Sequence, residues 1–378
     1  MQNEPDSKGL YIHIPFCKSK CSYCAFYSEP IDRHDPERLM RAIHKELSQA
    51  DTNCVRTVYI GGGSPSSLPG SLLCDLVRAI TDRRSGKICE FTIECNPGQT
   101  NPAMLDSLHR LGVNRLSFGA QSFIAEELQC LGRSHTAEAV EAAVHQARDA
   151  GFENISLDLI FAICDSTQSS WQESLDKAIA LNPEHISAYA LTLEAGTPLA
   201  KAVEKGRYSA IDEDTDRAMY EQAIDTLTGA GYEQYEISNF AKPGYKCRHN
   251  LGYWQNRPYI GIGPSAASSS GISRTQNICD IVAYVDAVEA GRSPVSESVQ
   301  ISRLDRICET AVLNLRTRDG IDVQKFKQVT GYDPTLLFAE PIGKLREQGL
   351  LNFTQDRIFL TKTALPVADY VLCDFAAL

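Results

Sequence analysis

The sequence predicts an α/β protein: a partial (β/α)6 TIM-like barrel around a mostly parallel sheet, followed by a mainly helical, winged-helix-like C-terminal domain. Two observations predict it. Short runs rich in β-branched and aromatic residues alternate with amphipathic, helix-length segments as far as residue 192, and the character of the sequence changes near residue 300. Such alternation is typical of right-handed βαβ units. The 378 residues have room for one domain of about 250 residues and a smaller one.

Six strands and five helices are expected in the first part of the chain. The strands are expected at 10–14, 57–61, 91–94, 115–119, 155–160 and 185–192, and the helices at 36–50, 71–82, 101–112, 136–151 and 169–181. Because these segments carry no strong dinucleotide-binding fingerprint, six such units indicate a barrel or part of one. Barrel enzymes carry their reactive groups on loops at the carboxyl ends of the strands, so we expect the functional residues there.

We predict four parts: an N-terminal extension at 1–9, the barrel and its extension at 10–265, a connecting segment at 266–299, and the C-terminal domain at 300–378. In the last part, 303–316, 323–331 and 334–351 have helical character, and 351–365 alternates like a two-stranded wing. Winged-helix modules often bind DNA, but they also serve as lids and dimerisation elements, so the fold alone does not decide between these roles.

Charge and apolar patterning restrict the class of partner. With 48 acidic and 37 basic residues the net charge is −11, which argues against nucleic acid, because phosphate backbones are bound by clusters of Lys and Arg. The sequence shows no apolar leader and no run of about 18 apolar residues, so we expect no membrane span. Its 13 cysteines, mostly scattered, favour a reducing cytoplasm, or an organelle matrix if a transit peptide has been removed.

Three cysteines, Cys17, Cys21 and Cys24, form a C-x3-C-x2-C motif directly after the first expected strand, and Phe26 stands where a fourth might follow. Structural zinc normally takes four protein ligands, so a zinc site would need His13 or Cys247 as the fourth. A 4Fe–4S cluster held by three thiolates has one iron without a protein ligand, and that iron can bind a small molecule through amino and carboxylate groups. Both alternatives remain open from the residues alone.

The motif and its surroundings resemble the radical S-adenosylmethionine (SAM) superfamily. The segments LYIHIPFCKSKCSYCAFYS, TVYIGGGSPSSLP, IECNPG, GVNRLSFGAQSF and CRHNLGYW resemble, in order, the coproporphyrinogen dehydrogenase-like branch and especially HemW-type haem chaperones. The likeness extends over 9–265 and is weaker beyond. It implies a radical SAM barrel in which Cys17, Cys21 and Cys24 hold a 4Fe–4S cluster and SAM binds to the open iron.

The resemblance also implies which residues contact SAM. Glycines after the second expected strand match positions that line the amino and carboxylate groups of SAM, and glycine lets the backbone approach a ligand. The implied contacts are Tyr11, Tyr23, Gly62, Gly63, Ser64, Glu94, Gln121, Arg133 and Asp158. Three structural alternatives stay open: a plain tight turn at the glycines, an interior ion pair between Glu94 and Arg133, and a strand-end cap at Asp158.

Membership of this superfamily implies an electron donor. A low-potential protein such as flavodoxin or ferredoxin would reduce the cluster, and SAM would then be cleaved to a 5′-deoxyadenosyl radical that abstracts hydrogen from a substrate. The cofactor carries that chemistry, while the protein orients it and excludes water. Lys18 and Lys20, beside the cysteines, either receive an acidic donor protein or are simply solvated.

Two features indicate the branch of the superfamily. Members that decarboxylate coproporphyrinogen carry CxxxCxxCxC, whereas this chain has Phe26 at the fourth position, so coproporphyrinogen dehydrogenase activity is not expected. His249 lies in HNLGYW, which preserves the HNxxYW pattern associated with haem handling. Its imidazole is a candidate axial haem ligand or a hydrogen-bonded structural group, Cys247 is a rival thiolate ligand, and Tyr253 and Trp254 would supply a flat aromatic wall.

We therefore expect a haem chaperone that binds a 4Fe–4S cluster, SAM and haem and delivers haem to respiratory acceptor proteins. The alternatives are a radical SAM oxidoreductase, such as an oxygen-independent coproporphyrinogen III dehydrogenase, and a zinc-stabilised interaction protein. Failure to form an iron–sulfur cluster, with stoichiometric zinc instead, distinguishes the last of these.

Two loops depart from the family pattern. FAICDSTQ has Ala162, Cys164 and Asp165 where relatives have a Gly-x-Pro loop, so its geometry is expected to differ. GIGPSAASS has Ala267 where chaperone-type relatives tend to have histidine, so haem coordination from that loop is not expected.

Overall fold

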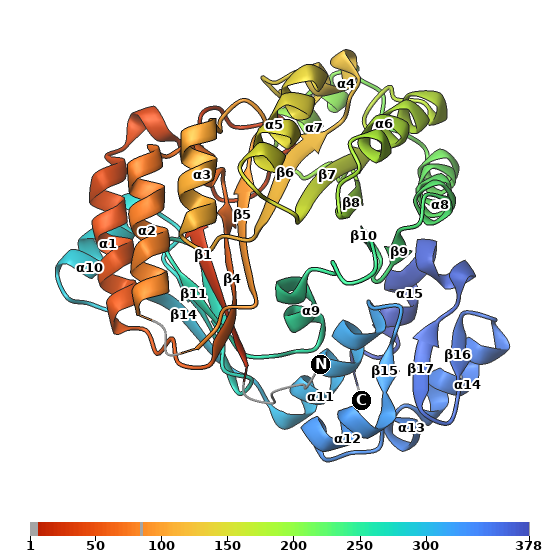
Figure 1. Cartoon of the computed structure of the whole chain (residues 1–378). Helices are drawn as coiled ribbons and strands as arrows, with labels where there is room; N and C mark the ends of the chain where they lie inside the picture. Colours follow the sequence, from red (N-terminus) through yellow and green to blue (C-terminus); the bar gives the residue numbers. More distant parts are fainter. Residues whose placement is uncertain (1–6, 84–85, 378) are drawn as a thin grey trace.

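The computed structural model describes residues 7–83 and 86–377. Within these ranges the main sheet has twelve strands in the order β14-β13-β12-β11-β1-β4-β5-β6-β7-β8-β10-β9. Six of them, β1 and β4 to β8, lie side by side in chain order and run parallel (Figure 1). In the described chain the two outermost strands do not pair with each other. The sheet is therefore an open, partial (β/α)6 barrel, which confirms the predicted fold class.

The central strands are β1 (Lys8–Ile14), β4 (Val55–Gly62), β5 (Glu90–Cys95), β6 (Arg115–Gln121), β7 (Ile155–Phe161) and β8 (His185–Ala190). The helices after them are α1 (Pro36–Gln49), α2 (Gly70–Asp82), α3 (Pro102–Arg110), α4 (Ala125–Cys130), α5 (Ala137–Asp149), α6 (Gln168–Ala180), α7 (Pro198–Glu204) and α8 (Glu213–Gly229). Each strand and helix predicted for this part is present. The alternating pattern of the sequence does not predict α4, α7 or α8.

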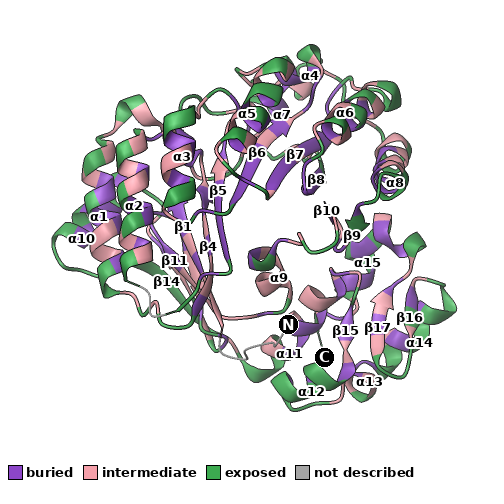
Figure 2. Ribbon diagram, viewed as in Figure 1, coloured by how far each residue is buried: buried purple, intermediate pink, exposed green. Residues whose placement is uncertain are grey.

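Side chains alternate between the two faces of the central strands, and this separates an apolar core from a polar interior. Leu10, Ile12 and Ile14 of β1 are fully buried, whereas Tyr11 and His13 point to the opposite, concave face. In Figure 2 the strands are largely buried and the surrounding helices are exposed on their outer sides. The same alternation buries Val58, Ile60, Phe91, Ile93, Leu116, Phe118, Leu157, Leu159, Ile186 and Ala188.

Polar side chains fix where many of the surrounding helices begin. The Asp35 carboxylate accepts a 3.0 Å hydrogen bond from the Arg38 backbone N–H at the start of α1. Such a cap satisfies a backbone donor that the first helical turn leaves without a partner. The same type of cap begins α3, α5, α6 and α8, at Asn101, Thr136, Thr167 and Asp212.

Short strands that the sequence does not predict extend the sheet at both edges. On one side β11 (Tyr259–Ile262) runs parallel to β1, and β12 (Ala267–Ser269), β13 (Ser273–Asn277) and β14 (Val295–Gln300) continue it antiparallel. On the other side β10 (Asn239–Ala241) joins β8 to β9 (Glu233–Gln234). Two further helices, α9 (Arg248–Trp254) and α10 (Ile281–Glu289), belong to this region.

The C-terminal part combines helices with a small sheet. The helices are α11 (Arg303–Leu315), α12 (Val323–Thr330), α13 (Pro334–Leu337), α14 (Ala339–Glu347) and α15 (Ala368–Cys373). The sheet has the order β15 (Ile321–Asp322), β17 (Arg357–Leu360) and β16 (Leu351–Phe353), all antiparallel.

Two details of this part differ from the prediction. The single helix expected at 334–351 is two helices that meet at Phe338. Pro341 accounts for the second start, because proline is tolerated in the first turn of a helix but not in its interior. The wing has a third strand, β15, in addition to the two that the alternation predicts. Among the described residues, no helix is both long and apolar enough to cross a membrane.

A first prediction concerns the stability that the core of the barrel contributes. Phe118 of β6 is fully buried, so Phe118→Ala should lower the free energy of unfolding by about 3–5 kcal/mol through lost burial and a residual cavity. Chemical denaturation with a constant m-value measures it. Val282→Ala, at a side chain that is 51% exposed, is the control and should cost less than about 0.5 kcal/mol. Equal losses in the two variants would contradict the assignment of the core.

Candidate cluster and cofactor site

The cysteine motif begins at Cys17, the last residue of β2 (Phe16–Cys17), and continues on the loop that leads to β3 (Glu29–Pro30). These two short strands follow β1 and pair with each other in parallel. Ser22 holds the middle of this loop. Its N–H donates to the Leu131 carbonyl at 3.0 Å, its hydroxyl donates to the Cys130 carbonyl at 2.7 Å, and its carbonyl accepts from the Leu199 N–H at 2.9 Å. The loop is therefore fixed against the end of α4 and the start of α7, at the carboxyl edge of the sheet.

Cys17, Cys21 and Cys24 are partly buried, free thiols on this loop. Burial raises the pKa of Cys17, and the neighbouring Cys21 and Cys24 raise it further, so the three groups lie within electrostatic reach of one another. The Arg133 guanidinium donates to Cys21 Sγ at 3.3 Å, which places a positive charge beside the thiols. Within the described residues, no three His, Cys, Asp or Glu side chains are placed to hold one metal ion together.

Arg133 has other partners besides the cysteine. It donates to Asn96 Oδ1 at 2.5 Å and to the Gly119 carbonyl at 2.7 Å. These contacts join the loop after β5 to the end of β6 beneath the cysteine loop. The alternative of a direct ion pair with Glu94 is not the arrangement found, because Arg133 is engaged by Asn96, Gly119 and Cys21.

Glu94, near the carboxyl end of β5, faces the interior of the barrel. Its carboxylate accepts a 2.8 Å hydrogen bond from the Tyr59 hydroxyl and a 3.1 Å hydrogen bond from the Gly62 N–H. Burial raises the pKa of Glu94 to about 7, and the nearby charge of Asp158 adds to the rise, although both hydrogen bonds oppose it. The residue as a whole is partly buried, and the surrounding protein removes most of the water from its carboxyl group. Glu94 therefore titrates near neutral pH.

Asp158 lies in the middle of β7, so the strand-end cap is the wrong interpretation of this residue. Its carboxylate accepts hydrogen bonds from the hydroxyls of Ser187 at 2.7 Å and Ser117 at 3.1 Å. Burial raises its pKa, and the hydroxyls oppose that rise. Tyr23, from the cysteine loop, lies within electrostatic reach of Asp158 and Arg133. The loop and the polar interior therefore meet here.

Gly61 and Gly62 end β4 and Gly63 follows it, and neighbouring protein groups leave no room for a side chain at any of the three. Gly62 has φ +106°, a conformation that side chains disfavour, and a Cβ there would meet the His13 ring. A Cβ at Gly61 would lie 2.7 Å from the Glu94 carboxyl, and one at Gly63 would lie 2.5 Å from the Phe16 carbonyl. A side chain at Gly62 would therefore disturb His13 before it met any ligand.

Tyr11 contacts His13, the residue whose ring lies against Gly62. Its hydroxyl and His13 Nδ1 are hydrogen-bonded at 2.9 Å, and His13 Nε2 lies 2.9 Å from the Tyr27 carbonyl. Burial raises the pKa of Tyr11 well above its usual value, with Glu94 and Tyr253 as further causes. Tyr11, Gly62 and Glu94 thus belong to one set of contacts.

Two of the predicted SAM contacts lie at the margin of this set. Ser64 is buried, and its hydroxyl is 3.0 Å from Ser66 Oγ and 3.0 Å from Gln99 Oε1. Gln121 ends β6 with φ +67° and places its amide beside Gly119. The structure therefore links Arg133 and Tyr23 to the cysteine loop, and Tyr23 in turn to Asp158. Tyr11, Gly62 and Glu94 belong to a separate set of contacts around Tyr59 and His13, and the Ser64 side chain is engaged by its neighbours.

His249 lies at the opposite, amino-terminal end of the strands. It is 2% exposed, and its two ring nitrogens are 2.9 Å from Thr57 Oγ1 and 3.0 Å from the Tyr253 hydroxyl. Burial lowers the pKa of His249 to about 3, so the ring is neutral at physiological pH. Cys247, the rival ligand, is fully buried. In this arrangement His249 is a hydrogen-bonded structural group, and iron could reach its Nε2 only in place of Tyr253.

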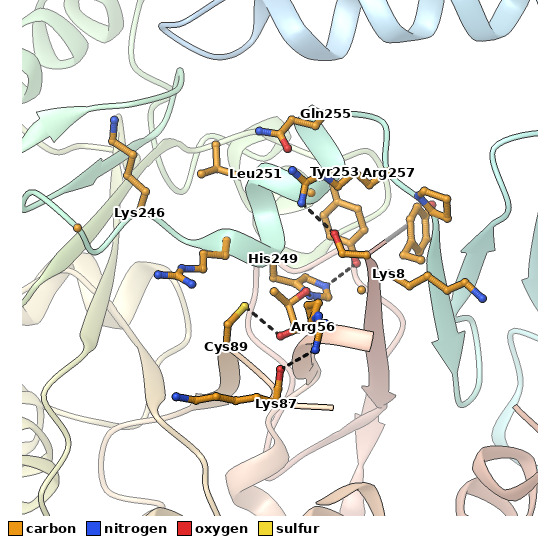
Figure 3. Close-up of a pocket in the computed structure, with 18 residues that line it drawn as sticks. Lys8, Arg56, Lys87, Cys89, Lys246, His249, Leu251, Tyr253, Gln255 and Arg257 are labelled. Carbon is orange, nitrogen blue, oxygen red and sulfur yellow. Dashed lines mark hydrogen bonds between the residues drawn. The ribbon is translucent and has the colours of Figure 1, made fainter. Parts of the chain in front are cut away.

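A cavity of 680 Å³ opens beside His249 (Figure 3). Residues from the segments 7–9, 56–57, 87–89 and 244–259 line it, and we call it the amino-terminal cavity. Tyr253 is part of its wall, as the aromatic-wall hypothesis expects. Trp254 does not line it; its ring lies instead 5.0 Å from the Arg316 guanidinium of the C-terminal part.

The two departing loops have the following geometry. Ala162 and Asp165 take positive φ values of 54° and 61°, a region in which glycine is unstrained and alanine is not. The Cys164 thiol is hydrogen-bonded to Cys130. Ala267 begins β12 and pairs with Gln276.

Several side chains of the site are not predicted from the sequence. Tyr59 supports Glu94, Asn96 supports Arg133, and Ser117 and Ser187 support Asp158. Tyr59 precedes Gly61 by two residues and Asn96 follows Glu94 by two. Because side chains two apart on a strand share a face, the period-two pattern was the signal that could have found them.

Comparison with known proteins agrees with this geometry. The Radical SAM superfamily matches residues 11–178, and the HemN C-terminal domain matches residues 301–367. The protein named Heme chaperone HemW from Bacillus subtilis is 34% identical to this chain, over 94% of this chain and 95% of its own length. The chain belongs to the HemW family of radical SAM proteins. Heme chaperone HemW from Lactococcus lactis is 33% identical, over 99% of this chain and 98% of its own.

A solved structure shares the fold of this HemW-family chain. Coproporphyrinogen III oxidase (HemN) from Escherichia coli aligns with a TM-score of 0.86, covering 98% of this chain and 91% of that one, at 22% identity. At that identity the likeness concerns the fold alone.

A second prediction concerns the pH dependence of stability that Glu94 causes. A carboxyl group whose pKa rises from 4.5 to about 7 on folding stabilises the folded state below pH 4.5, and that contribution is lost as pH rises to about 7. Glu94→Gln removes the titration. The difference in unfolding free energy between wild type and Glu94→Gln should therefore change by up to about 1.4 kcal/mol per pH unit across this window, with wild type losing stability. A difference that does not vary with pH would show that Glu94 has an ordinary pKa.

Proposed function

We propose that this HemW-family protein is a haem chaperone that holds a 4Fe–4S cluster on Cys17, Cys21 and Cys24, binds SAM beside it, and carries haem to respiratory acceptor proteins in the cytoplasm. The observation that carries the proposal is the cysteine loop. Three cysteines share a loop that Ser22 fixes, and the Arg133 guanidinium donates to one of them, Cys21. The near full-length likeness to proteins named Heme chaperone HemW supports it.

The donor set suits an iron–sulfur cluster. Thiolates are the usual protein ligands of such clusters, and three of them leave one iron open for the amino and carboxylate groups of SAM. When reduced, the bound cluster supplies the electron for cleavage of SAM. The protein's part is to neutralise charge with Arg133 and to keep water out through the packed strand ends.

The interior side chains suit SAM, which carries both positive and negative groups. Glu94 and Asp158 supply carboxylates in the polar interior, and Tyr23 of the cysteine loop lies within electrostatic reach of Asp158. We assign SAM to these groups, with Tyr11, Gly62, Gly63, Ser64, Gln121 and Arg133 as the other contacts. Gly62 offers its backbone, since its Cβ position is filled by His13.

Phe26 favours the chaperone over the oxidase. Its side chain is 72% exposed beside the cysteine loop, and it stands where decarboxylating relatives have a fourth cysteine. The exposed Lys18 and Lys20 on the same loop suit an acidic electron donor such as flavodoxin or ferredoxin. The second candidate, a radical SAM oxidoreductase, has the shared fold as its support.

A third prediction concerns the cysteines proposed as ligands of the cluster. Cys17→Ala, Cys21→Ala and Cys24→Ala should each abolish the broad absorption near 400 nm after anaerobic reconstitution, because each thiolate binds a different iron. Cys54→Ala, at an exposed cysteine elsewhere, is the matched control and should keep full absorption. Cys130 is not a suitable control, since its carbonyl holds Ser22. A complete cluster in Cys21→Ala would remove that residue from the ligand set.

A fourth prediction concerns haem binding and the residue that binds the haem iron. The reconstituted protein, given an electron donor and SAM, should bind haem and should not convert coproporphyrinogen III to protoporphyrinogen IX. If His249 is the axial ligand, His249→Ala should shift the Soret band and weaken haem binding at least about tenfold. Tyr253→Phe frees Nε2 from its hydrogen bond and should preserve or strengthen binding.

The outcomes of that experiment separate the alternatives. Cys247→Ala should change the haem spectrum only if the ligand is a thiolate. Wild-type haem spectra in both His249→Ala and Cys247→Ala would place the iron ligand elsewhere. Robust oxidation of coproporphyrinogen III by the wild-type protein would overturn the assignment to the chaperone branch.

A further inference from the structure

The turn that follows α4 packs against the backbone of the cysteine loop. The carbonyls of Cys130 and Leu131 accept from the hydroxyl and the N–H of Ser22. Gly132, the next residue, has φ +68°, and a Cβ there would lie 3.1 Å from the Ser22 backbone nitrogen. Glycine is therefore needed both for the conformation and for the close approach. Because turn and loop are fixed to each other, Arg133 starts from a set position beside the cysteines.

The Arg133 guanidinium is held at three points. Its Nη2 group donates to Asn96 Oδ1 at 2.5 Å and to the Gly119 carbonyl at 2.7 Å, and its Nη1 group donates to Cys21 Sγ at 3.3 Å. The two oxygens are neutral, and in the described chain Arg133 forms no ion pair with Asp or Glu. Its positive charge is therefore not cancelled by a carboxylate. Of its three acceptors, only the Cys21 sulfur becomes negatively charged, as the thiolate that binds iron.

Asn96 is itself anchored. It follows β5, and its backbone N–H donates to Ser66 Oγ at 3.0 Å. Ser66 Oγ in turn lies 3.0 Å from Ser64 Oγ and 3.3 Å from Gln99 Oε1, and both serines are buried. The Asn96 side chain thus extends from a fixed backbone, and its amide oxygen offers Arg133 an acceptor in a set direction.

A positively charged hydrogen-bond donor beside a ligating sulfur changes the redox properties of an iron–sulfur cluster. Reduction adds an electron, so it adds negative charge to the cluster and its thiolates. A guanidinium N–H aimed at one of these sulfurs stabilises the reduced form more than the oxidised form, because the attraction grows with the negative charge. A residue that holds such a donor in place acts on the cluster through it.

We propose that Arg133 raises the reduction potential of the cluster by donating to the sulfur of Cys21, and that Asn96 is the positioning residue that holds Arg133 there. The inference rests on the proposed cluster and adds a role for Arg133 to its assigned contact with SAM. In the electron transfer concerned, the donor protein loses one electron and the cluster gains it, with no bond made or broken. A higher potential makes this transfer more favourable for any given donor.

The reduction potential of the anaerobically reconstituted full-length protein tests the proposal. It is measured without SAM, in a redox titration followed by electron paramagnetic resonance. Arg133→Met removes the charge and the donor and should lower the potential by at least about 59 mV, a tenfold change in the ratio of reduced to oxidised cluster. Arg133→Lys keeps the charge and should lower it less. The control Arg110→Met, at a 75% exposed side chain that ends α3, makes the same change in net charge and should keep the wild-type potential.

The role of Asn96 is measured through Arg133. Asn96→Leu removes the acceptor at similar side-chain size and should shift the potential in the same direction as Arg133→Met, but by less. Because Asn96 acts through Arg133, the double variant Asn96→Leu/Arg133→Met should have the potential of Arg133→Met alone. Additive shifts, or an unchanged potential in Asn96→Leu, would contradict the positioning role.

The other outcomes distinguish the inference from the proposed function. Circular dichroism and the visible absorption of the cluster establish that each variant is folded and loaded. If Arg133→Met weakens SAM binding in calorimetry but keeps the wild-type potential, Arg133 is a SAM contact only, and the inference is wrong while the cluster stands. If Arg133→Met assembles no cluster, wild-type potentials in both Arg133→Lys and Asn96→Leu overturn the inference. If the wild-type protein forms no cluster, the proposed function and the inference fail together.

Discussion

The concave face of the parallel strands is polar and largely removed from bulk water, and the rest of the structure depends on how its groups are satisfied. A buried polar group without a partner costs roughly 1–3 kcal/mol. Asp158 is satisfied by hydroxyls from neighbouring strands, and Glu94 by a tyrosine and a backbone N–H. His185 is held between Ser156 at 2.8 Å and Tyr235 at 2.8 Å. Because these contacts cross from strand to strand, they fix the interior geometry more specifically than the apolar packing on the outer face can.

Strand direction then separates the two functional regions. All six central strands run the same way, so the loops that follow them meet at one edge of the sheet and the segments that precede them meet at the other. The cysteine loop is at the carboxyl edge and the amino-terminal cavity at the opposite edge, with the polar interior between them. The cysteine loop and the cavity therefore lie at opposite edges of one sheet and share no residues.

The sequence predicts the strands and helices of the barrel well, because alternation and caps are local signals. Cys17 stands out in the sequence by its spacing from Cys21 and Cys24, whereas Glu94 is singled out only by the resemblance to the superfamily. Tyr59 is missed because its role depends on its neighbour across the strands. The amino-terminal cavity cannot be predicted from the sequence for the same reason: its lining joins four separate segments between residues 7 and 259. The prediction that Trp254 joins Tyr253 in one aromatic wall is wrong. Adjacent residues of a helix point to different sides, so Trp254 of α9 cannot face the cavity beside Tyr253.

One continuous set of contacts joins the two regions. The His249 ring at the cavity wall packs on Tyr59, with centroids 5.2 Å apart, and the Tyr59 hydroxyl donates to Glu94, which in turn accepts from the Gly62 N–H. Glu94, with a pKa of about 7, changes its charge near neutral pH, and the Tyr59 hydrogen bond is stronger to its charged form. The Tyr59–Glu94 hydrogen bond therefore lies between the His249 ring and the Gly62 N–H, and its strength depends on the charge of Glu94.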